Sequence, residues 1–196
     1  MWWSDDNQTL RFQEHSLHVN QFRQFARSLL DLAREKCDGL MYSWTPPVAL
    51  HQIHDTMSQT TPGYSFVQDP HNGLQTGFLD LSTRAYYRSP TPVFHGEQWA
   101  KPTAMQYLKD HEDFLALLYQ LLFVWGGQSP RPKELRSLEM VNGPATSRGF
   151  FIHNGAMVYI TRYHKAQRST GHQFHVARFL PEPIGHLVFY YLVYIR

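Results

Sequence analysis

Cysteine is almost absent from this sequence, and charged residues are scarce. Cys37 is the single cysteine among 196 residues, which excludes an internal disulfide and a multi-cysteine zinc site. Charged residues make up 17% of the chain, below the roughly 25% that is usual in soluble domains. The opening residues lack the basic and apolar regions of a secretory signal. No apolar run approaches the roughly 20 residues that cross a bilayer, so we expect no membrane partner.

Motifs for common cofactors and metals are missing as well. The sequence has no phosphate-binding glycine loop, no nucleophile elbow and no zinc-finger spacing, so we expect no cofactor. Among the 12 histidines, His51 with His54 and His172 with His175 are close pairs, and neither pair has the spacing of a zinc hydrolase. We therefore predict no metal site. A metal-dependent hydrolase would need histidines that converge in the folded chain.

Apolar residues are plentiful, and basic residues are concentrated in the last third. Hydrophobic residues make up 42% and aromatic residues 15% of the chain, which is too apolar for a disordered segment. The net charge of +2 says little about nucleic acid by itself. From residue 131 onward, however, basic residues outnumber acidic ones. The acidic residues are Glu134, Glu139 and Glu182, and the basic residues are Arg131, Lys133, Arg136, Arg148, Arg162, Lys165, Arg168, Arg178 and Arg196.

The first half of the chain is predicted to hold one helix and a long connector. Apolar residues recur at helical intervals between 17 and 37, and Gly39 fits the C-cap of that helix. From about 40 to 102, proline and glycine interrupt each periodic stretch, so we predict an irregular connector with short helical pieces. We therefore predict that the chain has two parts. Residues 1–102 form an N-terminal helix with an irregular connector, and residues 103–196 form the second part.

The second half predicts helices followed by a small sheet. A capping box of Thr103 and Gln106 starts a helix that the 126–127 glycines end, and a short helix follows over 132–140. Residues 150–153 and 157–163 form strands around an Asn154-Gly155 turn, with a third strand over 174–179 and a buried helix over 184–195. The expected class is α+β, mainly helical, with a small antiparallel hairpin or three-stranded sheet.

Two positions in this half resemble the active site of tyrosine recombinases and integrases. The glycine turn that leads into Arg131, Glu134 and Leu135 resembles the first active-site box of that family. Lys165, at the end of the second hairpin strand, resembles the place of the family's catalytic lysine. The resemblance implies a recombinase-like fold that is truncated after its first part.

The sequence is similar in more detail to fungal proteins related to the recombinases of Crypton elements. In those proteins a recombinase-like region stands alone or lies upstream of a RecQ-type helicase. The likeness covers most of the chain from about residue 60. It rests on Pro62-Gly63-Tyr64-Ser65-Phe66, Asp69-Pro70, Gly126-Gly127-Gln128 with Arg131, VYITRYHK over 158–165, Phe179-Leu180-Pro181 and Tyr190-Tyr191-Leu192.

This resemblance implies a role for each of the matched residues. Arg131 would hold the negative charge of the transferring phosphate, because a guanidinium stays protonated and presents a planar fork of donors. Lys165 would give a proton to the departing sugar oxygen. Glu134 would be structural. The predicted DNA contacts around the hairpin are Arg162, His164, Arg168 and Arg178.

The family's nucleophilic tyrosine and second His-x-x-Arg box are not matched. His175 and Arg178 have that spacing, but they fall in a predicted strand where the family has a helix. Tyr190, Tyr191 and Tyr194 are interpreted as core aromatics. We therefore expect a fragment or a degenerate copy that binds double-stranded DNA in the nucleus without completing catalysis.

Two alternatives remain open from the residues alone. Arg131 can also be an arginine at a helix start in a surface salt bridge, and the hairpin cations can belong to a solvated hairpin face. The chain then becomes a structural or protein-interaction module of a helicase-associated protein that has lost its DNA function. Its partner would be a RecQ-type helicase region or other copies of the chain, and its sign an exposed apolar face on the last helix.

Overall fold

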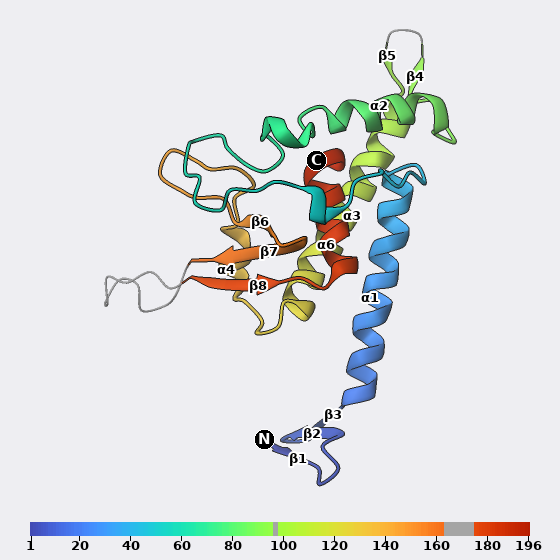
Figure 1. The fold of residues 1–196 in the computed structure, drawn as a ribbon. Helices are drawn as coiled ribbons and strands as arrows, with labels where there is room; N and C mark the ends of the chain where they lie inside the picture. Colours follow the sequence, from blue (N-terminus) through green and yellow to red (C-terminus); the bar gives the residue numbers. More distant parts are fainter. Residues whose placement is uncertain (96–97, 163–174) are drawn as a thin grey trace.

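Helices and small antiparallel sheets make up the fold of the computed structural model, which describes residues 1–95, 98–162 and 175–196 (Figure 1). The predicted α+β class, mainly helical with small antiparallel sheets, is confirmed. In chain order the elements are β1 (Trp2–Trp3), β2 (Thr9–Phe12), β3 (His15–His18), α1 (Val19–Leu40), η1 (Leu50–Gln52), η2 (Pro70–Asn72), α2 (Gly77–Arg88), β4 (Phe94–His95), β5 (Gln98–Trp99), α3 (Lys101–Trp125), α4 (Pro132–Arg136), β6 (Phe150–His153), β7 (Ala156–Thr161), β8 (Val176–Phe179), α6 (Glu182–Tyr190) and η3 (Tyr191–Ile195).

The core lies where α1, α3 and α6 pack together (Figure 1). The apolar stripe of α1 places Leu29, Leu30 and Ala33 in one cluster with Phe114 and Leu118 of α3. The predicted helix over 17–37 is confirmed, although Gly39 lies inside α1 rather than at its C-cap. Because this core draws on both halves of the chain, the proposed division at residue 102 runs through it.

The long helix α3 begins earlier than its predicted capping box. The helix starts at Lys101, with Ala100 as N-cap and a proline in the first turn, where the missing N–H costs nothing. Thr103 instead donates its hydroxyl to the carbonyl of Pro92. The predicted capping box of Thr103 and Gln106 was therefore wrong, whereas the predicted helix is confirmed.

The predicted irregular connector contains more order than expected. It includes α2, which buries Gly77 and Leu81, the β4–β5 hairpin and two short 3₁₀ turns. Helix α2 packs against the C-terminal η3 turn. That tertiary contact stabilises a segment whose flanking prolines and glycines indicate a loop.

The second three-stranded sheet, β6-β7-β8, is antiparallel as predicted. Asn154 and Gly155 have φ angles of 49° and 77°, the positive values that a type I′ turn requires. After β8, helix α6 and the π-helical turn η3 carry the chain back into the core, and η3 is buried throughout. The buried last helix is thus confirmed.

A first three-stranded sheet, β1-β2-β3, precedes α1 and was not predicted. It lies at the N-terminal end of α1, away from the body of the molecule (Figure 1). Trp2, Trp3 and Phe12 are all exposed on it. The strands are two to four residues long, and the alternation of polar and apolar residues in β2 covers only Thr9–Phe12, which is too short to predict a sheet from the sequence.

Candidate nucleic-acid interface

Steric constraints explain why glycine occupies both positions of the 126–127 turn. Gly127 has a φ of 82°, which favours glycine. A side chain on Gly126 would meet the hydroxyl of Tyr159 and, at 2.6 Å, the carbonyl oxygen of Leu122. Tyr159 is fully buried and donates its hydroxyl to that same carbonyl at 2.9 Å. The turn after α3 is therefore pressed against β7.

Arg131 lies directly after this turn, at the N-cap of α4. Its backbone N–H donates to the Glu134 carboxylate at 3.1 Å, and its Nε lies 4.0 Å from the other carboxylate oxygen. The Glu134 side chain is largely buried, whereas 56% of the Arg131 side chain is exposed. Glu134 thus holds the start of α4, and the Arg131 guanidinium remains open to a ligand.

Arg178 connects this turn to the sheet. Its Nε donates to the carbonyl of Gln128 at 2.8 Å, and its Nη1 donates to the hydroxyl of Thr161 at 2.7 Å. The guanidinium also lies 5.5 Å from the centre of the Tyr159 ring. We call this arrangement the Arg178 bridge. It places the residues before Arg131 beside the end of β7.

The same bonds remove Arg178 from the predicted DNA-contacting set. The residue is 6% exposed, and its donors are used inside the protein. A phosphate would have to displace these partners and uncover the guanidinium. Arg178 therefore holds the turn and the sheet together from inside the protein and is not exposed at the surface.

Arg162 follows β7 and is half-buried. Its Nη1 donates to the carbonyl of Ser147 at 2.9 Å. Burial and the nearby Arg148 guanidinium lower the pKa of Arg162. The other predicted residues of this region, His164, Lys165 and Arg168, lie outside the described residues, between β7 and β8.

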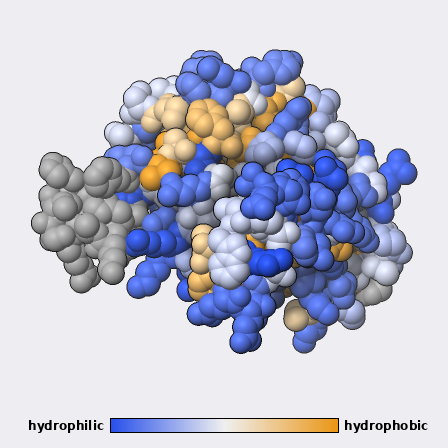
Figure 2. Space-filling model, turned by 90° about the horizontal axis from the view of Figure 1, so that it is seen from below, coloured by the Kyte–Doolittle hydropathy of each residue, from blue (hydrophilic) through white to orange (hydrophobic). Residues whose placement is uncertain are grey.

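The molecule is chiefly hydrophilic on the side seen from below, with one hydrophobic area in the upper part of that view (Figure 2). The C-terminal end of α3 and the turn that follows it point to this side (Figure 1). Exposed cations accompany Arg131 on α4, namely Lys133 and Arg136. The arrangement can offer positive charge to an extended anion.

The tyrosines near the C-terminus occupy the core, as the sequence predicts. Tyr191 and Tyr194 are 7% and 5% exposed, and Tyr190 packs against the same cluster. Burial raises the pKa of Tyr194 to about 12. A hydroxyl so placed is neither accessible to a phosphate nor readily deprotonated.

A buried ion pair, which the sequence reasoning missed, secures the 53–72 segment to the sheet. Arg148 and Asp55 have fully buried side chains, and Arg148 Nη2 lies 2.6 Å from Asp55 Oδ1. The second carboxylate oxygen accepts the backbone N–H of Ile152 in β6 at 2.9 Å. The guanidinium lies between the rings of Tyr64 and Phe151. No local motif marks either residue in the sequence.

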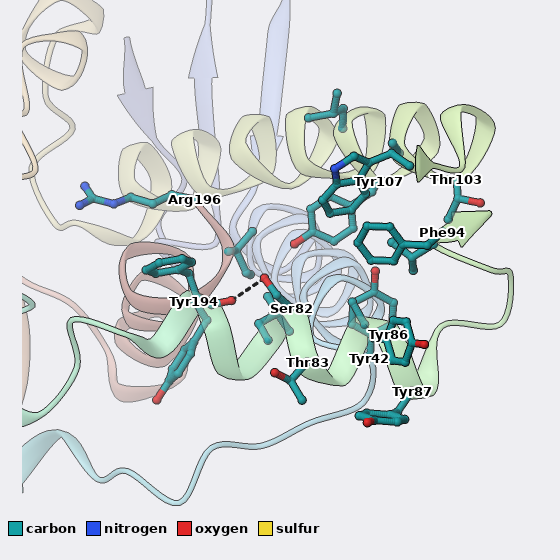
Figure 3. Close-up of a pocket in the computed structure, with 18 residues that line it drawn as sticks. Tyr42, Ser82, Thr83, Tyr86, Tyr87, Phe94, Thr103, Tyr107, Tyr194 and Arg196 are labelled. Atoms are coloured by element: carbon teal, nitrogen blue, oxygen red, sulfur yellow. Dashed lines mark hydrogen bonds between the residues drawn. The ribbon is translucent and has the colours of Figure 1, made fainter. Parts of the chain in front are cut away.

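An apolar pocket of about 830 Å³ lies between α2 and α3. Tyr42, Tyr86, Phe94 and Tyr107 gather around it in the close-up (Figure 3). Trp99 and Tyr86, which also line it, are each 63% exposed. Its few polar groups are hydroxyls and Arg196, so the pocket suits an apolar partner rather than a phosphate.

Histidines converge at one place, which was also missed. His54 and His71 both contact Asp69. The expectation of no metal site followed from sequence spacing, and His54 lies 15 residues from Asp69, too far to form a recognisable motif with Asp69 and His71. His51, the predicted companion of His54, is not a member of this cluster.

No family model matches the chain, and no solved structure matches it. Within the described part of the chain, no helix is both long enough and apolar enough to span a membrane.

Proposed function

We propose that this chain binds double-stranded DNA as the first part of a tyrosine recombinase-like domain. In this proposal it is a fragment or degenerate copy that acts in the nucleus and does not complete strand cleavage alone. The DNA-binding surface, which we call the basic face, consists of residues 126–136, and we assign Lys165 to the same function. The Arg178 bridge is the observation that supports it most, because it holds the turn before Arg131 beside the strand that leads to Lys165.

The chemistry of the basic face fits a phosphate backbone. The Arg131 guanidinium is exposed and can bind a phosphate in a bidentate manner. Lys133 and Arg136 add charge on the same short helix, where they would fix the register of the duplex. In the proposal, Lys165 supplies the proton to the leaving sugar oxygen. Glu134 positions Arg131 by accepting a hydrogen bond from its backbone N–H.

Duplex binding by fluorescence anisotropy tests the proposal. We expect the wild-type chain to bind a labelled duplex of mixed sequence and to lose affinity steeply between about 50 mM and about 200 mM salt. Arg131→Ala combined with Lys165→Ala should weaken binding by at least about 10-fold and lower the salt slope by about two phosphate contacts.

The matched control removes two arginines elsewhere. Arg23→Ala with Arg27→Ala makes the same change in net charge on exposed positions of α1. This variant should bind DNA within about 2-fold of the wild type, because contact charges matter more than total charge. Equal loss in both double variants, or no binding by a folded wild type at low salt, overturns the proposal.

Protein interaction is a second candidate function, which the apolar pocket favours. The last helix is buried as predicted, so the exposed apolar face that would have marked this alternative is not found there. Several exposed aromatic residues line the pocket instead, among them Tyr86 and Trp99. Under this alternative the folded chain does not bind DNA at low salt. It associates with itself in sedimentation, and Trp99→Ser with Tyr86→Ser abolishes that association.

A further inference from the structure

Two imidazoles share one buried carboxylate on the 53–72 segment. His54 Nδ1 lies 2.9 Å from Asp69 Oδ2, and His71 Nδ1 lies 2.8 Å from Asp69 Oδ1. One ligand atom from each residue can be chosen so that all lie within 4.8 Å of one another. The side chain of Asp69 is 7% exposed, whereas those of His54 and His71 are 58% and 79% exposed. The cluster is thus open on the histidine side.

Hydrogen bonds fix the backbone beneath these three side chains. Asp69 is the N-cap of the η2 turn and accepts the backbone N–H of His71 at 3.0 Å. Asn72 donates to the carbonyl of His54 at 2.8 Å and accepts the N–H of His54 at 2.8 Å. Asn72 therefore joins two stretches that are distant in the sequence. The site is organised before any ligand binds.

The Asp69 carboxylate also accepts a hydrogen bond from a tyrosine. The hydroxyl of Tyr64 donates to Asp69 Oδ2 at 3.1 Å. Burial raises the pKa of Asp69, but the bonds from His54, His71 and Tyr64 together outweigh it and keep that pKa well below its ordinary value. The residue next to His54 is Asp55, which the Arg148 ion pair anchors to the sheet. Asp69 is therefore a fixed anion facing two adjustable imidazoles.

The donor set matches a borderline divalent metal ion. Two imidazole nitrogens and one carboxylate oxygen are ligands that zinc accepts, and three protein ligands leave a fourth position for water. In a tetrahedral zinc site the ligand atoms lie about 3.3 Å apart, given bonds of about 2.0–2.1 Å. The present Nδ1 to oxygen distances of 2.8 and 2.9 Å are shorter, so the exposed imidazoles must move outward by about half an ångström.

We propose that His54, Asp69 and His71 form a site for Zn²⁺ or a similar transition-metal ion, with one coordination position open to water. In the metal-free protein each Nδ1 carries a hydrogen that is shared with the carboxylate. When Nδ1 binds the metal, each neutral imidazole moves its proton from Nδ1 to the exposed Nε2, and metal–nitrogen bonds replace both hydrogen bonds to the carboxylate. Tyr64 is a positioning residue, because it contacts Asp69 and not the ion.

Titration of the full chain with ZnCl₂ and CoCl₂ tests this inference. Calorimetry should give one equivalent of Zn²⁺, and Co²⁺ should produce the visible absorption of a site with four or five ligands. His54→Ala and His71→Ala should each weaken Zn²⁺ binding by more than about 10-fold, since loss of a ligand exceeds loss of an outer contact. Tyr64→Phe should weaken it by about 10-fold, while keeping the ring that lies over Arg148.

The control addresses the many other histidines of the chain. His51→Ala removes an exposed imidazole close to His54 in the sequence and outside the cluster, so the Zn²⁺ affinity should not change. No one-to-one binding, or equal loss in His51→Ala and His71→Ala, overturns the inference. Because the cluster and the basic face share no residue, either proposal can fail without the other.

Discussion

Arg148 is a buried cation with a single carboxylate partner among the described residues. Its side chain is fully buried, and its Nε and Nη1 have no hydrogen-bond acceptor among the described residues. Ring faces of Tyr64 and Phe151, at 4.9 and 4.5 Å from the guanidinium carbon, supply part of the missing electrostatic stabilisation. The Asp55 carboxylate supplies the counter-charge. A buried cation arranged in this way tolerates little change in its surroundings.

Removal of that counter-charge should destabilise the whole protein. We expect Asp55→Ala to lower the free energy of unfolding by about 3–5 kcal/mol, because it leaves a buried guanidinium without its counter-charge. It also leaves the N–H of Ile152 without its acceptor. Urea denaturation followed by circular dichroism measures the change.

Asp31→Ala is the corresponding control on the surface. Asp31 pairs with Arg34 on α1, and their side chains are 72% and 51% exposed. Loss of such a pair should cost less than about 0.5 kcal/mol. If Asp55→Ala were as mild as Asp31→Ala, the buried pair would not be the connection described for the 53–72 segment.

Among the elements, the turn after α3 has the least space for change. Gly126→Ala would place a methyl group against the Tyr159 hydroxyl and the Leu122 carbonyl. We expect this variant to lose at least about 1–3 kcal/mol of stability, as overpacked sites do. DNA binding should weaken with it, since the turn positions Arg131. Thermal denaturation and duplex titration measure the two effects.

The same substitution elsewhere provides its control. Gly39 lies within α1, and a side chain there meets nothing within 4 Å. Gly39→Ala should stabilise the protein by up to about 1 kcal/mol, because alanine favours a helix interior. A comparable loss in both glycine variants would contradict the steric account of the turn.

The elements with strong local signals could be predicted, and those stabilised by tertiary contacts could not. The Asn154-Gly155 hairpin and the apolar stripe of α3 follow from turn chemistry and helical spacing. Helix α2 was missed because its burial depends on the distant η3 turn. The β1–β3 sheet was missed because its short strands are exposed.

The candidate site divides in the same way. The place of Arg131 at the start of a short helix follows from the glycine turn and the proline after it. The burial of Arg178 does not, because its acceptors lie on Gln128 and Thr161, far from it in the sequence. The convergence of His54 and His71 likewise depends on Asn72, which joins their two segments through its side chain.

For the whole molecule, the position of the tyrosines sets an expectation about catalysis. Tyr191 and Tyr194 of η3 are buried in the core, and Tyr190, at the end of α6, is partly buried against the same cluster. We expect the purified chain to form no covalent adduct with a nicked duplex that traps such intermediates, because the core covers these three hydroxyls in large part. Denaturing electrophoresis of labelled DNA measures adduct formation. An adduct mapped by mass spectrometry to any of the three tyrosines would refute the view that the chain is catalytically incomplete.

The packing of α1 against α3 and α6 affects how the protein is made. The α1 residues are synthesised before α3 and α6, yet their apolar side is covered by elements that include α6. Until α6 has been synthesised, Leu29, Leu30 and Ala33 lack part of their native cover. The nascent chain carries an uncovered apolar surface during that interval, when chaperones can bind it.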